Sequence, residues 1–370
     1  MGTAAGPDAT AVKAALAGFP DPHLDAPITD AAELEDLSVV PGGDGARVEV
    51  TVRLPYPAQG VRAAWEAELA ERLDAREDVA SARVRLAWGE APQQPQGELP
   101  LLAGVANVIA VASGKGGVGK STTAVNLALA LSAEGARVGL LDADIYGPSQ
   151  GIMLGIEAGT RPEVREEKYF VPVRAHGIEA MSMSLLASQR TPMVWRGPMA
   201  SGALQQLVGQ TLWGELDYLI VDMPPGTGDI QLTLSQRVPL AGAVIVTTPQ
   251  DIALLDAVKG IEMFRKVDVP VLGIVENMSV HVCSACGHVE HLFGAGGGER
   301  VAGHYGTPVL GRLPLSLEIR EQADSGRPTV AADPEGAAAG LYRETARRLA
   351  AQLAARGAGT PAPTITILDD

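Results

Sequence analysis

Apolar runs rich in Val, Ile and Leu recur along the chain from about residue 100, and they limit the possible folds more than any other feature. They are separated by segments of helical composition, and within each run apolar residues follow one another without polar alternation. Strands of this kind are typical of a parallel sheet that is buried on both faces. The sequence therefore predicts an α/β domain with a doubly wound, mostly parallel sheet. The runs are residues 107–113, 136–144, 217–225, 242–249, 270–278 and 307–315.

Two helices can be delimited among these runs. Asp251 is expected to cap a helix, because a short acidic side chain can accept a hydrogen bond from a free N–H of the first turn. The segment 333–335, Asp-Pro-Glu, is expected to open the last helix. The apolar faces expected for the two helices are Leu254, Val258 and Ile261 in the first and Leu341, Leu349 and Leu353 in the second.

The front of the chain follows a different pattern. Two of its segments alternate apolar and polar residues, as half-buried strands do. A third segment carries Trp65, Leu69 and Leu73 at the spacing of one helix face. We therefore expect a small α+β unit here. Its expected elements are helices at 10–18 and 59–78 and strands at 45–55 and 80–88.

The change of pattern near residue 100 predicts two folded domains. A chain of 370 residues is also longer than a single hydrophobic core usually supports. The expected parts are a small acidic α+β domain at 1–90, a Pro- and Gln-rich linker at 91–100, the large α/β domain at 101–356 and a flexible tail at 357–370.

Charge and cysteine content narrow the class of protein further. The formal net charge of −15 argues against a nucleic-acid partner, since phosphate contacts need clustered Lys and Arg. No apolar run is long enough to span a bilayer, and no signal peptide is visible, so we expect no membrane partner and a cytoplasmic location. Cys283 and Cys286 are the only cysteines, which suits a reducing compartment.

Residues 114–121 read GKGGVGKS and match the phosphate-loop pattern G-x-x-x-x-G-K-[ST]. The match follows an apolar run and opens an apolar helix, which makes a chance glycine-rich turn the weaker interpretation. Glycines let backbone N–H groups converge on phosphate oxygens, Lys120 adds a point charge, and the Ser121 hydroxyl can bind Mg²⁺. The predicted nucleotide-binding residues of this loop are Gly114, Lys115, Gly116, Gly117, Val118, Gly119, Lys120, Ser121 and Thr122.

The second lysine in the loop, Lys115, makes the segment KGGVGKST resemble the deviant Walker A family of dimeric ATPases. That family includes the MinD/ParA positioning ATPases, the nitrogenase iron protein and the arsenite-pump ATPases. The resemblance implies a P-loop NTPase fold, a homodimer, and a Lys115 that reaches the partner's nucleotide. The alternative is an exposed loop lysine, which is disfavoured because lysine is scarce in this chain.

Further acidic and amide residues follow the apolar runs, where ligands of an open α/β sheet bind. The resemblance implies that Asp144, in Asp142-Ala143-Asp144, orients the attacking water and is catalytic together with Lys115 and Lys120. Asp222 matches the Walker B acid that holds Mg²⁺ through water, and residues 222–229, DMPPGTGD, resemble the γ-phosphate-sensing switch. Caps or turn residues are the alternative for both aspartates.

The nucleotide base is expected to be adenine. No guanine-recognition motif Asn/Thr-Lys-x-Asp is visible in the sequence, which favours ATP. Asn277 resembles the asparagine of the family that contacts adenine, and its alternative role is to terminate a strand.

Cys283 and Cys286 form a C-x-x-C pair within residues 276–298. Two thiolates this close can bind one edge of a soft metal site but do not complete four ligands. A zinc site completed by His288 and His291 is one alternative, although four ligands within nine residues leave little chain to surround a tetrahedron. A redox pair is the other alternative.

Several motifs in the same order narrow the resemblance to the Mrp-type iron–sulfur cluster carriers, also called ApbC- or Nbp-type scaffold ATPases. This resemblance covers the chain from about residue 100 to 356. It implies an ATP-hydrolysing carrier that passes an iron–sulfur cluster to apo iron–sulfur proteins and works with assembly factors. The motifs are DADIYGPS at 142–149, DMPPGTGD, ENMS with C-x-x-C-G, LFGAGGGERVA at 292–302, LGRLPL at 310–315 and the run 319–328.

The acidic front domain resembles the small iron–sulfur assembly domain that is often fused ahead of such carriers. It departs from that domain's pattern, because FPDPHLDAPITD lacks an Asp-Pro-Glu run and the domain has no cysteine. We therefore interpret it as a partner-docking or regulatory unit.

The cysteine count predicts how such a carrier holds its cluster. A cluster ligated by cysteines alone needs four thiolates, so Cys283 and Cys286 of two chains are expected to bridge one cluster, with [4Fe–4S] favoured. Two other functions remain open: a MinD/ParA-type positioning ATPase, and a zinc-bound scaffold that uses ATP as a switch. The first needs a membrane-binding helix or a basic surface, and the acidic tail TPAPTITILDD offers neither.

Overall fold

The structure is a computed structural model, and it describes residues 6–89, 100–186, 197–283 and 285–358. The chain divides into two compact units, residues 1–91 with 350–370 and residues 92–349. Residues 91–99 of the linker predicted at 91–100 and residues 359–370 of the tail predicted at 357–370 lie outside the described residues, so the domain bounds stay predictions. Within the described ranges, no helix is both long and apolar enough to cross a membrane.

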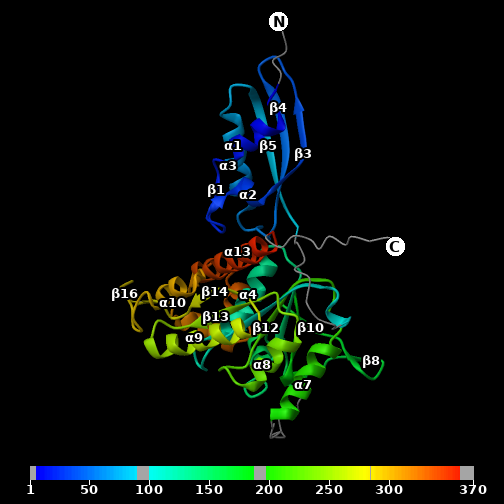
Figure 1. Ribbon diagram of the computed structural model, residues 1–370, viewed down its shortest axis with the longest axis vertical. Helices are drawn as coiled ribbons and strands as arrows, with labels where there is room; N and C mark the ends of the chain where they lie inside the picture. The colour runs from blue at the N-terminus through cyan, green and yellow to red at the C-terminus, as the bar shows by residue number, and fades with distance from the viewer. Residues whose placement is uncertain (1–5, 90–99, 187–196, 284, 359–370) are drawn as a thin grey trace, which may run out of the picture. The chain divides into compact units, whose positions relative to one another are not determined.

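An eight-stranded sheet forms the centre of the large unit, in the order β10-β11-β7-β12-β6-β13-β14-β17 (Figure 1). All neighbouring strands are parallel except β10 and β11. This confirms the predicted doubly wound, mostly parallel α/β fold. The strands are β6 (Val105–Ala112), β7 (Val138–Asp142), β10 (Val173–Ala175), β11 (Ile178–Ser182), β12 (Leu216–Asp222), β13 (Gly242–Thr247), β14 (Val271–Glu276) and β17 (Val309–Arg312).

The central strands are buried along their whole length. Every residue of β7, β13 and β14 is buried, so the sheet is covered on both faces, as the unbroken apolar runs predict. The helices of this unit are α4 (Lys120–Ala133), α5 (Gln150–Met153), α6 (Met183–Leu186), α7 (Gly197–Gln210), α8 (Asp229–Arg237), α9 (Asp251–Lys266), α10 (Gly297–Tyr305), α11 (Leu317–Asp324), α12 (Thr329–Ala332) and the first part of α13 (Ala337–Ala358), with a 3₁₀ turn at Pro100–Leu102.

Two helix predictions need correction. Asp251 is the first residue of α9 and not its cap; Gln250 precedes the helix without a side-chain capping bond, and the Asp251 carboxylate instead pairs with Arg300 at 3.2 Å. Leu341 is 42% exposed, because its neighbour Tyr342 takes the buried position at that turn of α13; Leu349 and Leu353 are buried as predicted.

A buried ion cluster joins α13 to the end of α4. The Glu134 carboxylate follows α4, is fully buried, and accepts hydrogen bonds from the Arg343 Nε at 2.8 Å and the Arg347 Nη1 at 2.7 Å. The two arginines lie four residues apart and so share one face of α13. The helix that starts at the phosphate loop is therefore tied, at its other end, to the last helix of the chain.

The front unit holds a three-stranded sheet in the order β3-β4-β5, with β3 antiparallel and β5 parallel to β4. Residues of β4 alternate between buried and less buried, as predicted. Trp65, Leu69 and Leu73 form the buried face of α3. The elements are α1 (Ala9–Leu16), β1 (Pro20–Asp21), β2 (Ala26–Pro27), α2 (Ile28–Ala31), β3 (Glu33–Val40), β4 (Ala46–Leu54), α3 (Arg62–Asp74) and β5 (Val79–Trp88).

Residues of the Asp-Pro-His segment form a buried polar cluster in this unit. The Tyr56 hydroxyl donates to the Asp21 carboxylate at 2.5 Å, and the His23 backbone N–H donates to the same carboxylate at 2.8 Å. The His23 ring stacks on Trp65 with centroids 5.4 Å apart. All three polar residues are at most 3% exposed. In this chain the segment therefore serves packing of the domain interior.

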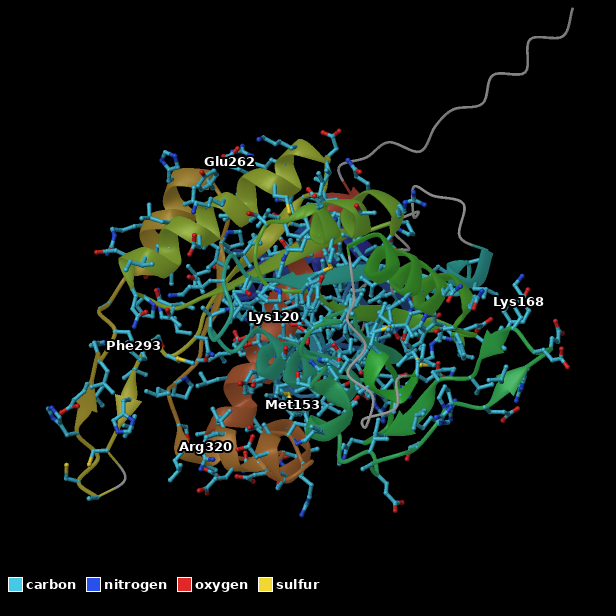
Figure 2. All side chains as sticks on the ribbon, turned by 90° about the horizontal axis from the view of Figure 1, so that it is seen from below. Lys120, Met153, Lys168, Glu262, Phe293 and Arg320 are labelled. Atoms are coloured by element: carbon cyan, nitrogen blue, oxygen red, sulfur yellow. The ribbon has the colours of Figure 1, made fainter. Side chains whose placement is uncertain are left out.

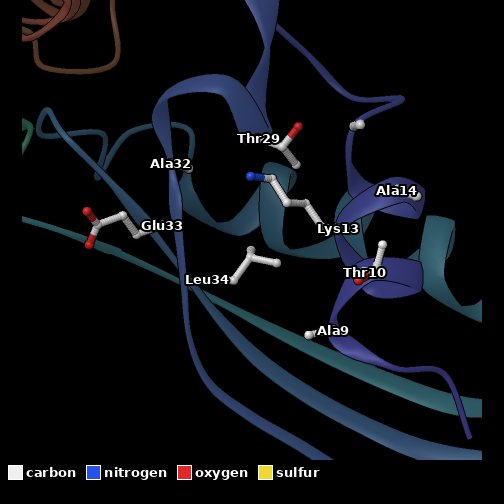
Figure 3. A pocket seen from close by; sticks show the side chains of 9 residues that line it. Ala9, Thr10, Lys13, Ala14, Thr29, Ala32, Glu33 and Leu34 are labelled. Carbon is white, nitrogen blue, oxygen red and sulfur yellow. The ribbon is translucent and has the colours of Figure 1, made fainter. Parts of the chain in front are cut away.

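A groove of about 780 Å³ lies on the front unit between α1, α2 and the start of β3 (Figure 3). Small side chains such as Ala14 and Ala32 line it, and the Lys13 side chain extends across it toward Thr29. The groove is an accessible surface of the acidic domain with one basic group.

Candidate nucleotide and cluster site

A glycine-rich loop joins β6 to α4 at the carboxyl edge of the sheet. Gly117 and Gly119 have φ values of 80° and 83°, a region that residues with a Cβ rarely adopt. An added Cβ at Gly114 would collide with the Asp256 carbonyl of α9, and one at Gly119 with the Asn277 amide. Gly114, Gly117 and Gly119 are thus required by backbone conformation or by space, and the loop leaves the first-turn N–H groups of α4 accessible to it.

Lys120, the first residue of α4, lies inside the large unit (Figure 2) and pairs with a buried carboxylate. Its Nζ is 2.5 Å from Asp222 Oδ1, 3.9 Å from Asp144 Oδ2 and 3.2 Å from the Ser121 hydroxyl. The structure therefore brings together four predicted site residues that lie up to 102 positions apart in sequence. In this structure the Lys120 ammonium balances the negative charge of Asp222 and Asp144.

Two aspartates stand side by side on neighbouring strands. Asp142 ends β7 and is in register with Asp222, which ends β12. The Asp142 carboxylate accepts hydrogen bonds from the backbone N–H groups of Asp144 and Gln150, at 3.2 and 3.1 Å, and from the Ser182 hydroxyl at 2.9 Å. Burial, and secondly the nearby Asp222 charge, raise the pKa of Asp142 to about 7.

Asp144 differs from Asp142 in its surroundings. It lies beyond the strand end, is 8% exposed, and accepts a hydrogen bond from the Gly147 N–H at 3.3 Å. Burial raises the pKa of Asp144 above its usual value, and the Lys120 charge opposes that rise. Of the two acids of Asp142-Ala143-Asp144, the second is therefore the one that faces the site, whereas the first holds the surrounding loop.

Gln150, which the sequence analysis missed, closes this site. Its Nε2 donates to Asp222 Oδ2 at 2.8 Å and to the Ser121 carbonyl at 3.0 Å, and the residue is 1% exposed. No motif includes this position, because its role depends on how residues 145–149 fold back over the phosphate loop. Ser182 was also missed; it ends β11 and reaches Asp142 because the parallel register of β11 and β7 pairs the two residues.

Asn277 follows β14 and reaches the phosphate loop. Its Nδ2 donates to the Val118 carbonyl at 2.8 Å, and its backbone N–H donates to the Thr247 carbonyl at 2.8 Å. The predicted adenine contact stays a prediction; what the structure shows is a side chain at the nucleotide loop.

Lys115 is half-buried in the loop, where the Ser113 hydroxyl donates to its carbonyl at 2.8 Å. Across the part of the chain that the structure describes, no ion pair joins its amino group to an acidic side chain.

The two cysteines lie in a small hairpin that stands out from the sheet. Its strands are β15 (His281–Val282) and β16 (Val289–Glu290), and in Figure 2 it projects from the periphery near Phe293, away from Lys120. The Cys283 N–H donates to the His288 carbonyl at 2.9 Å, and the Gly287 N–H donates to the Cys283 carbonyl at 2.8 Å. The turn therefore places both sulfurs at the end of the hairpin.

The surroundings of Cys283 favour its thiolate form. The backbone N–H of Ala285, then that of Cys286, then the Cys286 thiol lower the pKa of Cys283 below its usual value. Cys286 is exposed, and Val282, Val289 and Leu292 nearby are each about half exposed. Among the described residues, no group of three or more His, Cys, Asp and Glu side chains is arranged to hold a metal ion. The pair thus offers two ligands at an open, partly apolar surface.

A phosphate loop with paired strand-end acids at the edge of a parallel sheet defines a P-loop NTPase. The chain belongs to the family described as NUBPL iron-transfer P-loop NTPases, whose profile matches residues 104–350. The profile of a second family, described as iron–sulfur cluster assembly protein, matches residues 9–85 and confirms the resemblance of the front domain.

Two similar proteins are named as iron–sulfur cluster carriers. The iron–sulfur cluster carrier protein of Pseudomonas fragi is 68% identical over 268 residues, which cover 72% of this chain and 93% of that protein. The iron–sulfur cluster carrier protein of Escherichia coli K12 is 60% identical over 262 residues, 71% of each chain.

Two solved structures share the fold. The nucleotide-binding protein of Archaeoglobus fulgidus, in complex with ADP, is 37% identical, covers 64% of this chain and 91% of its own, and superposes with a TM-score of 0.56. The cell division ATPase MinD of Pyrococcus furiosus is 21% identical, covers 66% and 98%, and has a TM-score of 0.51, a likeness of fold alone.

Proposed function

We propose that this protein binds an iron–sulfur cluster at Cys283 and Cys286 and transfers it to apo-proteins, in a cycle controlled by ATP binding and hydrolysis. The observation that carries the proposal is the exposed C-x-x-C hairpin on a P-loop NTPase domain. The names of the similar carriers support the same function. A positioning ATPase has no specific observation in its favour.

The stoichiometry of thiolates supports a cluster shared between two chains. Each chain contributes two cysteines, whereas a cluster held by cysteine alone, [4Fe–4S] included, takes four. A two-fold axis through one interface supplies the second pair. The half-exposed Val282, Val289 and Leu292 give this end of the hairpin apolar surface for such an interface. A cluster held there is accessible to a recipient, as transfer requires.

The nucleotide site has the groups that ATP hydrolysis needs. In our proposal Lys120 would leave Asp222 to bind phosphate oxygens. The Ser121 hydroxyl would then bind Mg²⁺, and the freed Asp222 carboxylate would hold the ion through water. Asp144 positions the attacking water, and Lys115 stabilises the partner's nucleotide across the dimer. The donor set fits Mg²⁺, which favours carboxylate, hydroxyl and retained waters.

Asn277 gives the two sites a short covalent connection. Its side chain binds the phosphate loop at Val118, and only the segment 278–282 separates it from Cys283. The same segment is held by the Ser279 N–H, which donates to the Leu313 carbonyl at 3.0 Å, and by His291, whose Nδ1 is 2.9 Å from the Ser279 carbonyl. A change in the loop on nucleotide binding therefore has a route to the hairpin.

The front domain is proposed as the docking unit for assembly factors or apo iron–sulfur recipients. It has no cysteine for a cluster of its own. Its match to the assembly-protein profile and the groove beside Lys13 support a binding role.

The decisive experiment is anaerobic reconstitution followed by transfer to an apo-protein, with and without ATP. We expect one cluster per two chains, in a dimer, and loss of the cluster with intact nucleotide binding in Cys283→Ala and Cys286→Ala. Iron, sulfide and zinc are measured together with the molecular mass.

His288→Ala and His291→Ala are the matched controls, because both histidines lie beside the cysteines in sequence. They should keep the cluster. Full occupancy in the double cysteine variant, or one cluster per monomer, would contradict the bridging proposal. Stoichiometric zinc that depends on both histidines would identify the zinc-bound scaffold instead.

A further inference from the structure

Gln150 carries a buried oxygen that nothing in the described part of the chain satisfies. Its Oε1 has no hydrogen-bond partner there, although the residue is only 1% exposed. A buried amide oxygen without a partner loses the hydrogen bonds it had in water, which is unfavourable. Such an atom in a native structure calls for an explanation, and a bound ion or water beside it is one.

The orientation of this amide is fixed by its neighbours. The Ser121 carbonyl can only accept hydrogen bonds, and the Asp222 carboxylate receives the Lys120 ammonium and so also acts as an acceptor. Both must therefore bind the amide nitrogen, and the oxygen must be turned away from both. The main chain is held too, since the Gln150 N–H donates to Asp142 at 3.1 Å.

We propose that Gln150 is a positioning residue for the metal of the nucleotide: its Nε2 fixes the orientation of Asp222, and its Oε1 accepts a hydrogen bond from a water bound to Mg²⁺. The inference rests on the proposed function, in which Ser121 and Asp222 hold Mg²⁺. Mg²⁺ keeps several of its waters, and each water needs acceptors for its protons. Gln150 contacts both expected holders of the metal and has an acceptor left over.

The two oxygens of the Asp222 carboxylate have different partners. Gln150 Nε2 binds Oδ2, whereas Lys120 binds Oδ1. When Lys120 turns to phosphate, Oδ1 becomes available and Oδ2 stays held by the glutamine. Partners of this outer kind usually change metal affinity by about 10- to 100-fold when removed.

The test is equilibrium binding of ADP, measured in EDTA and in Mg²⁺, for the full-length protein and for Gln150→Met and Gln150→Leu. Both variants keep the bulk of the side chain and remove its hydrogen bonds. We expect unchanged ADP affinity in EDTA and a loss of about tenfold or more in the affinity gained from Mg²⁺. The Mg²⁺ concentration for half-maximal ATPase activity should rise by the same factor.

Gln322→Met is the matched control. Its amide also has a buried Oε1 without a partner in the described residues, but it lies on α11 and donates to Glu318 of the same helix. We expect no change in its Mg²⁺ dependence.

Three results would overturn the inference. A full Mg²⁺ gain in the Gln150 variants shows that the amide does not serve the metal. Equal losses of ADP affinity with and without Mg²⁺ show a purely structural role. ADP affinity of the wild type that is the same with and without Mg²⁺ shows that no metal binds with the nucleotide. A wild type that binds ADP in a Mg²⁺-dependent way but does not hydrolyse ATP contradicts the proposed hydrolysis and leaves the inference standing.

Discussion

At the scale of single residues, the nucleotide site is a balance of buried charges around one lysine. Lys120 lies 2.5 Å from Asp222 and 3.9 Å from Asp144, and all three are buried. The phosphate loop, Asp144 and Asp222 were predictable because each belongs to a motif at a strand end. Gln150 and Ser182 were not, since neither belongs to a motif and only tertiary folding aligns the start of α5 and the end of β11 with the acids.

Lys120→Ala should impair both binding and stability. The variant loses a phosphate ligand, and it leaves the buried Asp222 charge unpaired, a loss of about 3–5 kcal/mol in the free energy of unfolding. Nucleotide titration and chemical denaturation measure the two effects. Lys120→Arg keeps the charge and should recover stability but not full affinity, since the guanidinium is a planar fork and not a compact ammonium. Unchanged stability in Lys120→Ala would refute the charge-balance argument.

Asp144→Ala should keep nucleotide binding and lose turnover, because its expected task is to position water and not to hold the ground-state phosphates. Binding of ATP and the steady-state ATPase rate are compared with those of Asp324→Ala, which removes an exposed acid of α11. Equal ATPase rates in wild type and Asp144→Ala would rule out the role given to this aspartate.

At the scale of elements, the sequence pattern identified the strands of the central sheet except those at one edge. The unbroken apolar runs of β6, β7 and β12–β14 have no other stable placement than a covered parallel sheet. In the central sheet, β11 is short and shows no clear hydrophobic period. In the front unit, β3 is an acidic edge strand whose register is irregular where Asp36 has a positive φ, and it shows no clear hydrophobic period either. The buried face of α13 was predicted one residue out of place at Leu341.

The link between α4 and α13 should be a large term in the stability of the NTPase domain. Glu134→Ala leaves the guanidinium groups of Arg343 and Arg347 without their buried carboxylate, and we expect a loss of about 3–5 kcal/mol in the free energy of unfolding. The exposed pair Arg320–Asp324 is the control, and Arg320→Ala should change stability by at most about 1 kcal/mol. Similar small losses in both variants, measured by denaturant titration, would contradict a special role for the buried cluster.

At the scale of the whole molecule, the dimer proposed here requires that Lys115 act on its partner. Mixed Lys115→Ala and Asp144→Ala chains should form heterodimers with one site that keeps both groups and one that has neither. Random pairing then restores about a quarter of the wild-type ATPase rate, although each variant alone is nearly inactive. No recovery in mixtures that form heterodimers, as shown by mass analysis of tagged chains, would place Lys115 in its own site or outside the reaction.

The position of the cysteine hairpin affects how such a protein can evolve. β15 and β16 belong to none of the eight strands of the sheet and contain no residue of the phosphate loop. In the proposed function the cluster site and the nucleotide site are therefore encoded separately: substitutions between residues 281 and 290 alter the cluster site without changing a residue of the nucleotide site. The bound group could change in evolution in this way, and the same short hairpin could be grafted onto another ATPase of this architecture.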